Sequence, residues 1–265
     1  MKKLILSTSC NYNWDNIKLW NTSAKNTGSD VCNILINPSE DLLNGCKNNK
    51  INAVTYTPNK FDTTPYHLRF LLQYKYLMSV KDQYSHVIVT DSRDVYFHHD
   101  PFPKLLEIMK KTKKDIVCGS ECILYKDEGW NNKNLQTGFG YLYEEIKNNE
   151  VCCVGVLGGK TQAVADLCLM IYMLSLNNPA GIVDQISLNV LLATEFGKEK
   201  IAITRPSEGL IVHLHVMRSK SDYVDKITEK PSWDEDLVPT VNNIPIPIIH
   251  QYDRLDPSVW SKYCK

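Results

Sequence analysis

The stretch Ser85-His86-Val87-Ile88-Val89-Thr90-Asp91-Ser92-Arg93-Asp94-Val95-Tyr96-Phe97 decides the fold. Val87, Ile88 and Val89 form an uncharged β-branched run, which predicts a strand buried on both faces of a parallel sheet. The run ends in two carboxylates, Asp91 and Asp94. In open α/β sheets, ligands bind beyond the carboxyl ends of the strands. The sequence therefore places this acidic pair where a ligand would bind.

The spacing of the two acids suggests a metal ion. Two carboxylates this close repel each other unless a cation or a basic side chain lies between them. Carboxylate oxygens suit Mg²⁺ or Mn²⁺, whose other coordination positions are commonly filled by phosphates and water. We therefore interpret Asp91 and Asp94 as a divalent-metal pair. In the alternative interpretation, Asp94 pairs with Arg93 or caps a turn, and no metal binds.

The rest of the chain alternates between strand and helix patterns. We expect strands over 3–8, 31–36, 51–57, 115–121, 151–159, 201–204, 210–215 and 244–250. Helices are expected over 14–26, 41–50, 103–111 and 161–176, with others starting at Pro65 and near Asp184. This alternation is typical of a parallel sheet with helices on its faces. We expect one Rossmann-like α/β domain with a mostly parallel central sheet flanked by helices.

Composition narrows the functional classes. Thirty basic and thirty acidic side chains give no net charge over 265 residues. A general nucleic-acid binder needs a basic surface, so we expect no nucleic-acid partner. Nine cysteines without the spacing of a disulfide scaffold or a zinc site indicate reduced, partly buried thiols. The apolar run Leu4-Ile5-Leu6 is too short for a signal peptide, and no segment is long enough to cross a membrane, so we expect a soluble, cytoplasmic protein.

The motif resembles that of a known enzyme family. A hydrophobic strand running into Asp-x-x-Asp-Val-x-Phe (91–97) and then Asp-Pro-Phe (100–102) is similar to the metal motif of nucleotide-sugar-dependent glycosyltransferases with the GT-A fold. The Asp-x-x-Asp form resembles that of the procollagen lysyl hydroxylase glycosyltransferase domains and of related microbial and viral sugar transferases. The resemblance implies one GT-A-like domain over 1–265, with a nucleotide-binding half (1–100) and an acceptor-binding half (101–265). It also implies Mn²⁺ or Mg²⁺ bound to the diphosphate of a UDP-sugar.

The resemblance implies a donor site around the first strand and the metal motif. Thr8, Ser9 and Tyr12 would face the nucleotide, although the hydroxyls alone are also typical of a helix cap. Arg69 would approach the donor, and its alternative is a solvated helix face. Arg254, and also Lys262, would neutralise the diphosphate. His250, late in the chain, would complete the metal site with Asp91 and Asp94, with His213 as the competing histidine.

Acceptor-side residues are implied further along the chain. Glu121 ends a predicted strand, and Trp130 follows in an aromatic loop; Glu121 could instead be a surface acid. Asp184-Gln185 resembles the Asp-Gln segment that faces the acceptor or the transferring sugar, and Asp184 could also be a helix N-cap. The family's Asn or Ser before the first strand glycine is replaced here by Cys152, Cys153 and Val154. Residues 131–149 read as a polar excursion, and 218–236 as a solvated loop or lid.

These features predict a metal-dependent glycosyltransferase that moves a hexose from a UDP-sugar to a hydroxyl of a glycan, a protein or a lipid-linked glycan. The Asp-x-x-Asp form and the late histidine favour retention of anomeric configuration. Glu121 or Asp184 would position the acceptor hydroxyl or take its proton. A non-catalytic carbohydrate- or nucleotide-binding protein of the same fold is the alternative. A metal-dependent phosphatase or nucleotidyltransferase would need more carboxylates than the sequence supplies.

Overall fold

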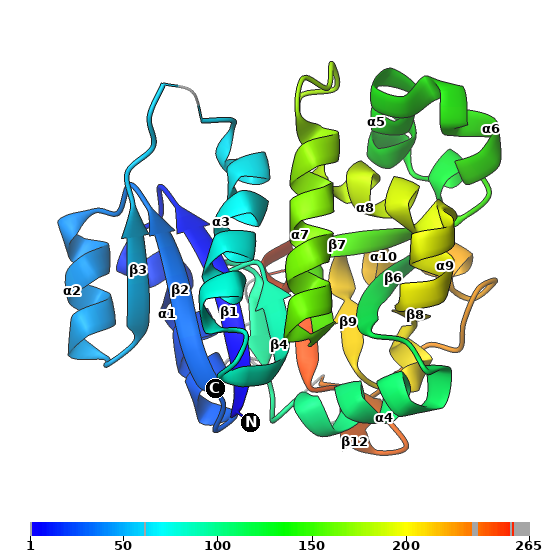
Figure 1. Cartoon of the computed structure of the whole chain (residues 1–265). Coiled ribbons are helices and arrows are strands. Elements are labelled where there is room, and N and C mark those ends of the chain that lie inside the picture. The colour runs from blue at the N-terminus through cyan, green and yellow to red at the C-terminus, as the bar shows by residue number, and fades with distance from the viewer. Residues whose placement is uncertain (1, 61, 235–237, 255, 257–265) are drawn as a thin grey trace.

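A central sheet organises the chain. The computed structural model describes residues 2–60, 62–234, 238–254 and 256. Its seven-stranded sheet has the order β3-β2-β1-β4-β7-β6-β8 (Figure 1). The strands are β1 (Lys2–Cys10), β2 (Asp30–Ile36), β3 (Asn52–Tyr56), β4 (Tyr84–Thr90), β6 (Ile116–Leu124), β7 (Glu150–Lys160) and β8 (Ile201–Thr204). All neighbours pair in parallel except β7, which is antiparallel to β4 and β6, so the predicted mostly parallel α/β sheet is confirmed.

Helices cover both faces of the sheet. Figure 1 shows α3 (Pro65–Val80) and α7 (Thr161–Ser175) side by side in front of it. They bury an apolar layer that includes Leu68 and Ile171. On the opposite face, α1 (Trp14–Asn26) and α4 (Phe102–Thr112) bury Trp20 and Phe102. The other helices are α2 (Glu40–Asn48), α5 (Gly129–Phe139), α6 (Tyr143–Ile146), α8 (Asp184–Ala193), α9 (Glu195–Lys200), α10 (Leu214–Ser219) and α11 (Ser221–Val224).

Strand β4, which precedes the acidic motif, is buried on both faces, as its β-branched run predicts. Val87, Ile88 and Val89 of β4 are at most 3% exposed, because β4 is paired on both edges and covered on both faces. The chain runs from β3 at the sheet edge through α3 to β4, which lies on the other side of β1. The strand order therefore reverses between β1 and β4, and ligands bind at such a reversal in open α/β sheets.

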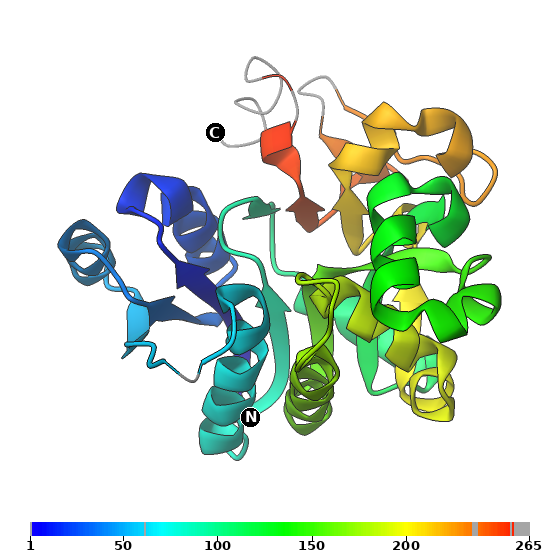
Figure 2. The same cartoon turned by 90° about the horizontal axis from the view of Figure 1, so that it is seen from above.

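A second, small sheet brings the end of the described chain to the acidic motif. Its order is β5-β13-β9, formed by Val95–Phe97, Ile248–His250 and Ile211–His213. Strand β13 pairs antiparallel with β5, so His250 is opposite Val95, and it pairs in parallel with β9, so His250 is beside His213. Figure 2 shows β13 beside the connection that follows β4. A third sheet joins β10 (Ser232–Trp233), β11 (Pro239–Val241) and β12 (Ile244–Pro245).

Several predicted segments differ from the structure. Residues 131–149, predicted as a polar excursion, lie mostly in α5, a 3₁₀ turn (Gly140–Leu142) and α6, because Leu135, Phe139 and Ile146 give them a buried side. Of residues 218–236, predicted as a solvated loop or lid, 218–234 are described; they include the end of α10, all of α11 and strand β10. The predicted strand 244–250 is broken into β12 and β13 at Pro247, which lacks the N–H that a ladder needs. In the described part of the chain, no helix has the length and apolarity to cross a membrane.

The cysteines described by the structure carry free thiols, as the composition predicts. They are Cys10, Cys32, Cys46, Cys118, Cys122, Cys152, Cys153 and Cys168. All but Cys10 are buried.

Candidate functional site

A cleft of about 870 Å³ opens at the strand-order reversal. Residues of the central sheet, of the helices that flank it and of the small β5-β13-β9 sheet line this cleft. It gathers nearly all the side chains singled out in the sequence: Thr8, Tyr12, Arg69, Asp91, Asp94, Glu121, Trp130, Asp184, Gln185, His250 and Arg254. Lys262 lies outside the described residues.

Three ligand atoms from distant segments converge in this cleft. His250 Nε2 lies 3.7 Å from Asp91 Oδ2 and 3.6 Å from Asp94 Oδ1. The three side chains form a group whose ligand atoms lie within 4.8 Å of one another. A metal with bonds of about 2.1 Å separates neighbouring ligands by about 3 Å, so a small contraction would close this set around one ion. His213 is not in this group, and the geometry therefore favours His250 over His213 as the third ligand.

Gly155 leaves space beside these atoms. A Cβ at this position of β7 would lie 2.8 Å from Asp91 Oδ2, 2.9 Å from His250 Nε2 and 2.5 Å from His250 Cε1. The Gly155 carbonyl also accepts a 2.8 Å hydrogen bond from the Asp91 backbone N–H, which fixes Asp91 against β7. A side chain at this position would therefore displace Asp91 or His250. The residues present therefore fit a divalent ion.

Arg69 of α3 orients the carboxylate of Asp91. Its guanidinium donates to Asp91 Oδ1 and, over 2.9 Å, to Asp184 Oδ2. Asp91 Oδ2 remains directed toward His250, so Arg69 and a metal would use different oxygens of the same carboxylate. Burial would raise the pKa of Asp91, but Arg69 and His250 outweigh it and hold this pKa below its usual range. These ion pairs exclude the solvated helix face as the environment of Arg69, and its predicted contact with the donor stays a prediction.

His250 and His213 are joined by a buried hydrogen bond, and their pKa values shift in opposite directions. Their Nδ1 atoms are 2.9 Å apart. Burial, and then His250, lower the pKa of His213 well below its usual value. Burial would also lower the pKa of His250, but Cys153, Asp94 and Asp91 raise it well above its usual value. These opposite shifts favour a His250 Nδ1–H that donates to neutral His213, with His250 Nε2 facing the two acids.

A backbone irregularity shapes the position of Glu121. The prediction ended this strand at Glu121, but β6 continues to Leu124 and shifts register against β7 between Ser120 and Leu124. Cys122 has φ +57°, a left-handed conformation typical of a bulge, and bulges redirect neighbouring side chains. Glu121 is 6% exposed and lines the cleft, so it is not the surface acid of the alternative interpretation. Burial raises its pKa, which favours the protonated carboxyl.

Asp184 and Gln185 begin α8 at the cleft wall. Asp184 is the first helical residue and Val183 the N-cap, so the prediction of Asp184 as N-cap is wrong by one position. Besides binding Arg69, Asp184 accepts from the Gln185 N–H over 2.8 Å. Gln185 donates to Asn131 Oδ1 over 2.9 Å. These contacts join α8 to α3 and α5 and hold the side chains facing the cleft.

The first strand contributes less than predicted. Ser9 is fully buried and does not line the cleft, because alternation along β1 turns it to the other face. Its hydroxyl donates to Asn33 over 3.0 Å and contacts the Ser92 hydroxyl at 2.8 Å. Ser9 therefore supports the turn between Asp91 and Asp94, and its prediction as a nucleotide contact is wrong. Thr8 lines the cleft and accepts from Gln73 over 3.1 Å, and Tyr12 lines it from the connection to α1.

Sequence reasoning gave no site role to two contributors, Gly155 and Cys153. Arg93, the partner of Asp94 in the alternative interpretation, does pair with Asp94 at 3.9 Å, but it lies closer to Asp253, at 3.0 Å. Gly155 and Cys153 reach the cleft from an antiparallel strand whose register no local pattern specifies. The sequence did carry a signal for Cys153, because Cys152, Cys153 and Val154 stand where the resembling family has Asn or Ser.

Comparison with known proteins identifies the fold. No protein-family model matches the sequence, and no curated protein matches it. A glycosyltransferase involved in the glycosylation of the major capsid of PBCV-1 matches at 10% identity and TM-score 0.47, covering 100% of this chain and 98% of that one. Mouse xyloside xylosyltransferase 1, in its apo form, matches at 11% identity and TM-score 0.52, covering 94% of this chain and 97% of the other. The chain therefore shares the fold of the mouse enzyme over nearly the full length of both.

Proposed function

We propose that this protein is a metal-dependent glycosyltransferase that moves a hexose from a UDP-sugar to an acceptor hydroxyl. The observation that carries the proposal is the convergence of Asp91 Oδ2, Asp94 Oδ1 and His250 Nε2, beside the space left by Gly155, in a cleft at the strand-order reversal. Asp91 and Asp94 follow one strand, whereas His250 is recruited from more than 150 residues later by β13. A shared fold with mouse xyloside xylosyltransferase 1 adds support.

The cleft residues divide into a metal set and a donor set. Asp91, Asp94 and His250 would hold Mn²⁺ or Mg²⁺, with Arg69 fixing the orientation of Asp91. The bound ion would supply Lewis-acid stabilisation of the charge that develops on the UDP leaving group. Thr8 and Tyr12 line the cleft near β1, where the nucleotide would bind. Arg254, exposed at the rim, would add positive charge for the diphosphate.

We infer retention from the Asp-x-x-Asp form and the late His250, which the resemblance associates with retaining enzymes. An inverting enzyme needs a free carboxylate to take the acceptor proton from the opposite face. Asp184 is paired with Arg69 at 2.9 Å, so it is not free for this role. In a retaining mechanism, a leaving-group oxygen on the same face would accept the proton. Asp184, Gln185 and Glu121 would then position the acceptor, a hydroxyl of a glycan or a protein. NMR of the product tests this directly, because retention keeps the donor's anomeric coupling.

The activity is tested by UDP release from a panel of UDP-hexoses with Mn²⁺, Mg²⁺ or EDTA. We expect release only with a metal ion, and its loss in Asp91→Asn and Asp94→Asn. Asp82→Asn, at an exposed turn before β4, is the matched control and should keep activity. If the folded protein binds UDP-sugars equally well in EDTA and releases no UDP, the transferase proposal fails and a nucleotide- or carbohydrate-binding protein takes its place.

A further inference from the structure

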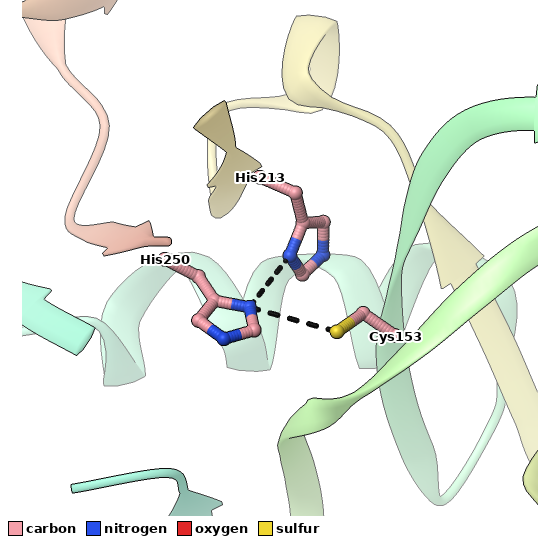
Figure 3. Close-up of side chains that lie close together, drawn as sticks. All are labelled: Cys153, His213 and His250. Carbon is pink, nitrogen blue, oxygen red and sulfur yellow. Dashed lines mark hydrogen bonds between the residues drawn. The ribbon is translucent and has the colours of Figure 1, made fainter. Parts of the chain in front are cut away.

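A second set of metal-ligating side chains lies directly behind the first. Cys153 of β7, His213 of β9 and His250 of β13 meet at the junction of the two sheets (Figure 3). His250 Nδ1 is 2.9 Å from His213 Nδ1 and 3.6 Å from Cys153 Sγ. All three residues are at most 3% exposed. The other ring nitrogen of His250 points away from this cluster, toward Asp91 and Asp94.

The distances suit a tetrahedral ion. Zn²⁺ binds sulfur at about 2.3 Å and nitrogen at about 2.0 Å, so a tetrahedral site separates two nitrogens by about 3.3 Å and nitrogen from sulfur by about 3.5 Å. The observed 2.9 Å and 3.6 Å need only small side-chain shifts to reach these values. Thiolate and imidazole select soft cations, whereas the carboxylates of the first set suit Mn²⁺ or Mg²⁺. The two clusters therefore differ in the ions that they prefer.

We propose that Cys153, His213 and His250 form a second metal site, for a thiophilic cation of the Zn²⁺ class, and that its occupation blocks the first site. Cys153 and His250 line the cleft, so the ion reaches the site from there, and its fourth position takes water. Three protein ligands with an open fourth position are a known arrangement for zinc.

The two sites exclude each other because they share one imidazole. A neutral ring has a single free lone pair, so His250 binds a metal through Nδ1 or through Nε2. Zinc at Nδ1 leaves the proton on Nε2, which faces Asp91 and Asp94. His250 is then lost as a ligand of the first site. Zinc binding releases the Cys153 proton and the Nδ1 proton of His250, with no redox change.

Zinc binding is tested without any enzymatic assay. The metal-stripped protein, residues 1–265, is titrated with Co²⁺, which reports a thiolate ligand by a near-ultraviolet charge-transfer band and is displaced by Zn²⁺. We expect the band in the wild type and in Cys10→Ser, a control thiol that also lines the cleft, and its absence in Cys153→Ser. Zn²⁺ should also raise the thermal midpoint of the wild type but not of Cys153→Ser. An unchanged band in folded Cys153→Ser, or no band in the wild type, would overturn the site.

The competition between Zn²⁺ and Mn²⁺ is measured by electron paramagnetic resonance of free Mn²⁺. Zinc at 100 times its Kd should weaken Mn²⁺ binding about 100-fold in the wild type and leave it unchanged in Cys153→Ser. Equal Mn²⁺ binding with and without bound zinc would refute the competition. The competition rests on the proposed function, because it assumes the Mn²⁺ site of Asp91, Asp94 and His250. Absence of Mn²⁺ binding without zinc counts against the proposed function, whereas absence of the Co²⁺ band counts against the zinc site.

Discussion

The space beside Gly155 gives the sharpest prediction. Gly155→Ala places a methyl group 2.8 Å from Asp91 Oδ2 and 2.5 Å from His250 Cε1, where ordinary contacts are about 3.4 Å or more. Strand β7 is paired on both sides and cannot yield easily, so Asp91 must move by about 0.6 Å and His250 by about 0.9 Å. Metal sites tolerate errors of about 0.2 Å in bond length, so at least one ligand is lost.

We expect Gly155→Ala to weaken Mn²⁺ binding by at least about 100-fold, above the upper end of losses from indirect perturbation of ligands. Overpacking should cost the fold only about 1–3 kcal/mol, so the variant remains folded. Electron paramagnetic resonance of free Mn²⁺ measures the affinity, and urea unfolding measures the stability. Gly140→Ala, whose added Cβ meets nothing within 4 Å, is the control. Wild-type Mn²⁺ affinity in Gly155→Ala would refute the assigned position of the metal.

Three further predictions follow from the surrounding contacts. Arg69→Met leaves Asp91 and Asp184 without their shared partner, so it should lower the free energy of unfolding by about 3 kcal/mol in urea titrations. Arg69→Lys should have an intermediate stability. Equal stability of the wild type and both variants would contradict the pairing. Cys153 and the neighbouring acids outweigh burial and raise the pKa of His250, so a proton on Nε2 competes with the metal near neutrality. The affinity for Mn²⁺ should therefore fall about tenfold per pH unit from pH 8 to 6. A Mn²⁺ affinity that calorimetry finds constant over this range would contradict this. Ser9→Ala should cost about 1–2 kcal/mol of stability, because the buried Asn33 loses a partner, while UDP-sugar affinity stays unchanged; weakened UDP-sugar binding at full stability would restore Ser9 as a nucleotide contact.

The fold was predictable where the signal is local. A buried β-branched strand ending in acids, a proline at the first position of α3 and the strand-helix alternation follow short-range patterns. They led to the sheet and to the positions of Asp91 and Asp94. The partnership of His250 with these acids was inferred from chain order in a resembling family, and the structure supplies its cause in the β5-β13 pairing.

Features that depend on long-range register were not predictable. Strand alternation places Ser9 inside and Thr8 at the cleft, but a one-residue shift would exchange them, and no local pattern excludes that shift. The bulge at Cys122 and the juxtaposition of Gly155 with His250 depend on how β6, β7 and β13 meet. The Cys153-His213-His250 cluster arises in the same way, because its members lie on three strands of two sheets.

The central claim is that Asp91, Asp94 and His250 together bind the divalent ion that holds the donor diphosphate. A crystal of the protein with Mn²⁺ and UDP, measured at the manganese absorption edge, tests it most directly. We predict one anomalous peak in the cleft, within about 2.3 Å of Asp91 Oδ2, Asp94 Oδ1 and His250 Nε2 and bonded to the diphosphate. UDP bound in the cleft with no peak there, or a peak bonded to other side chains, would contradict the claim.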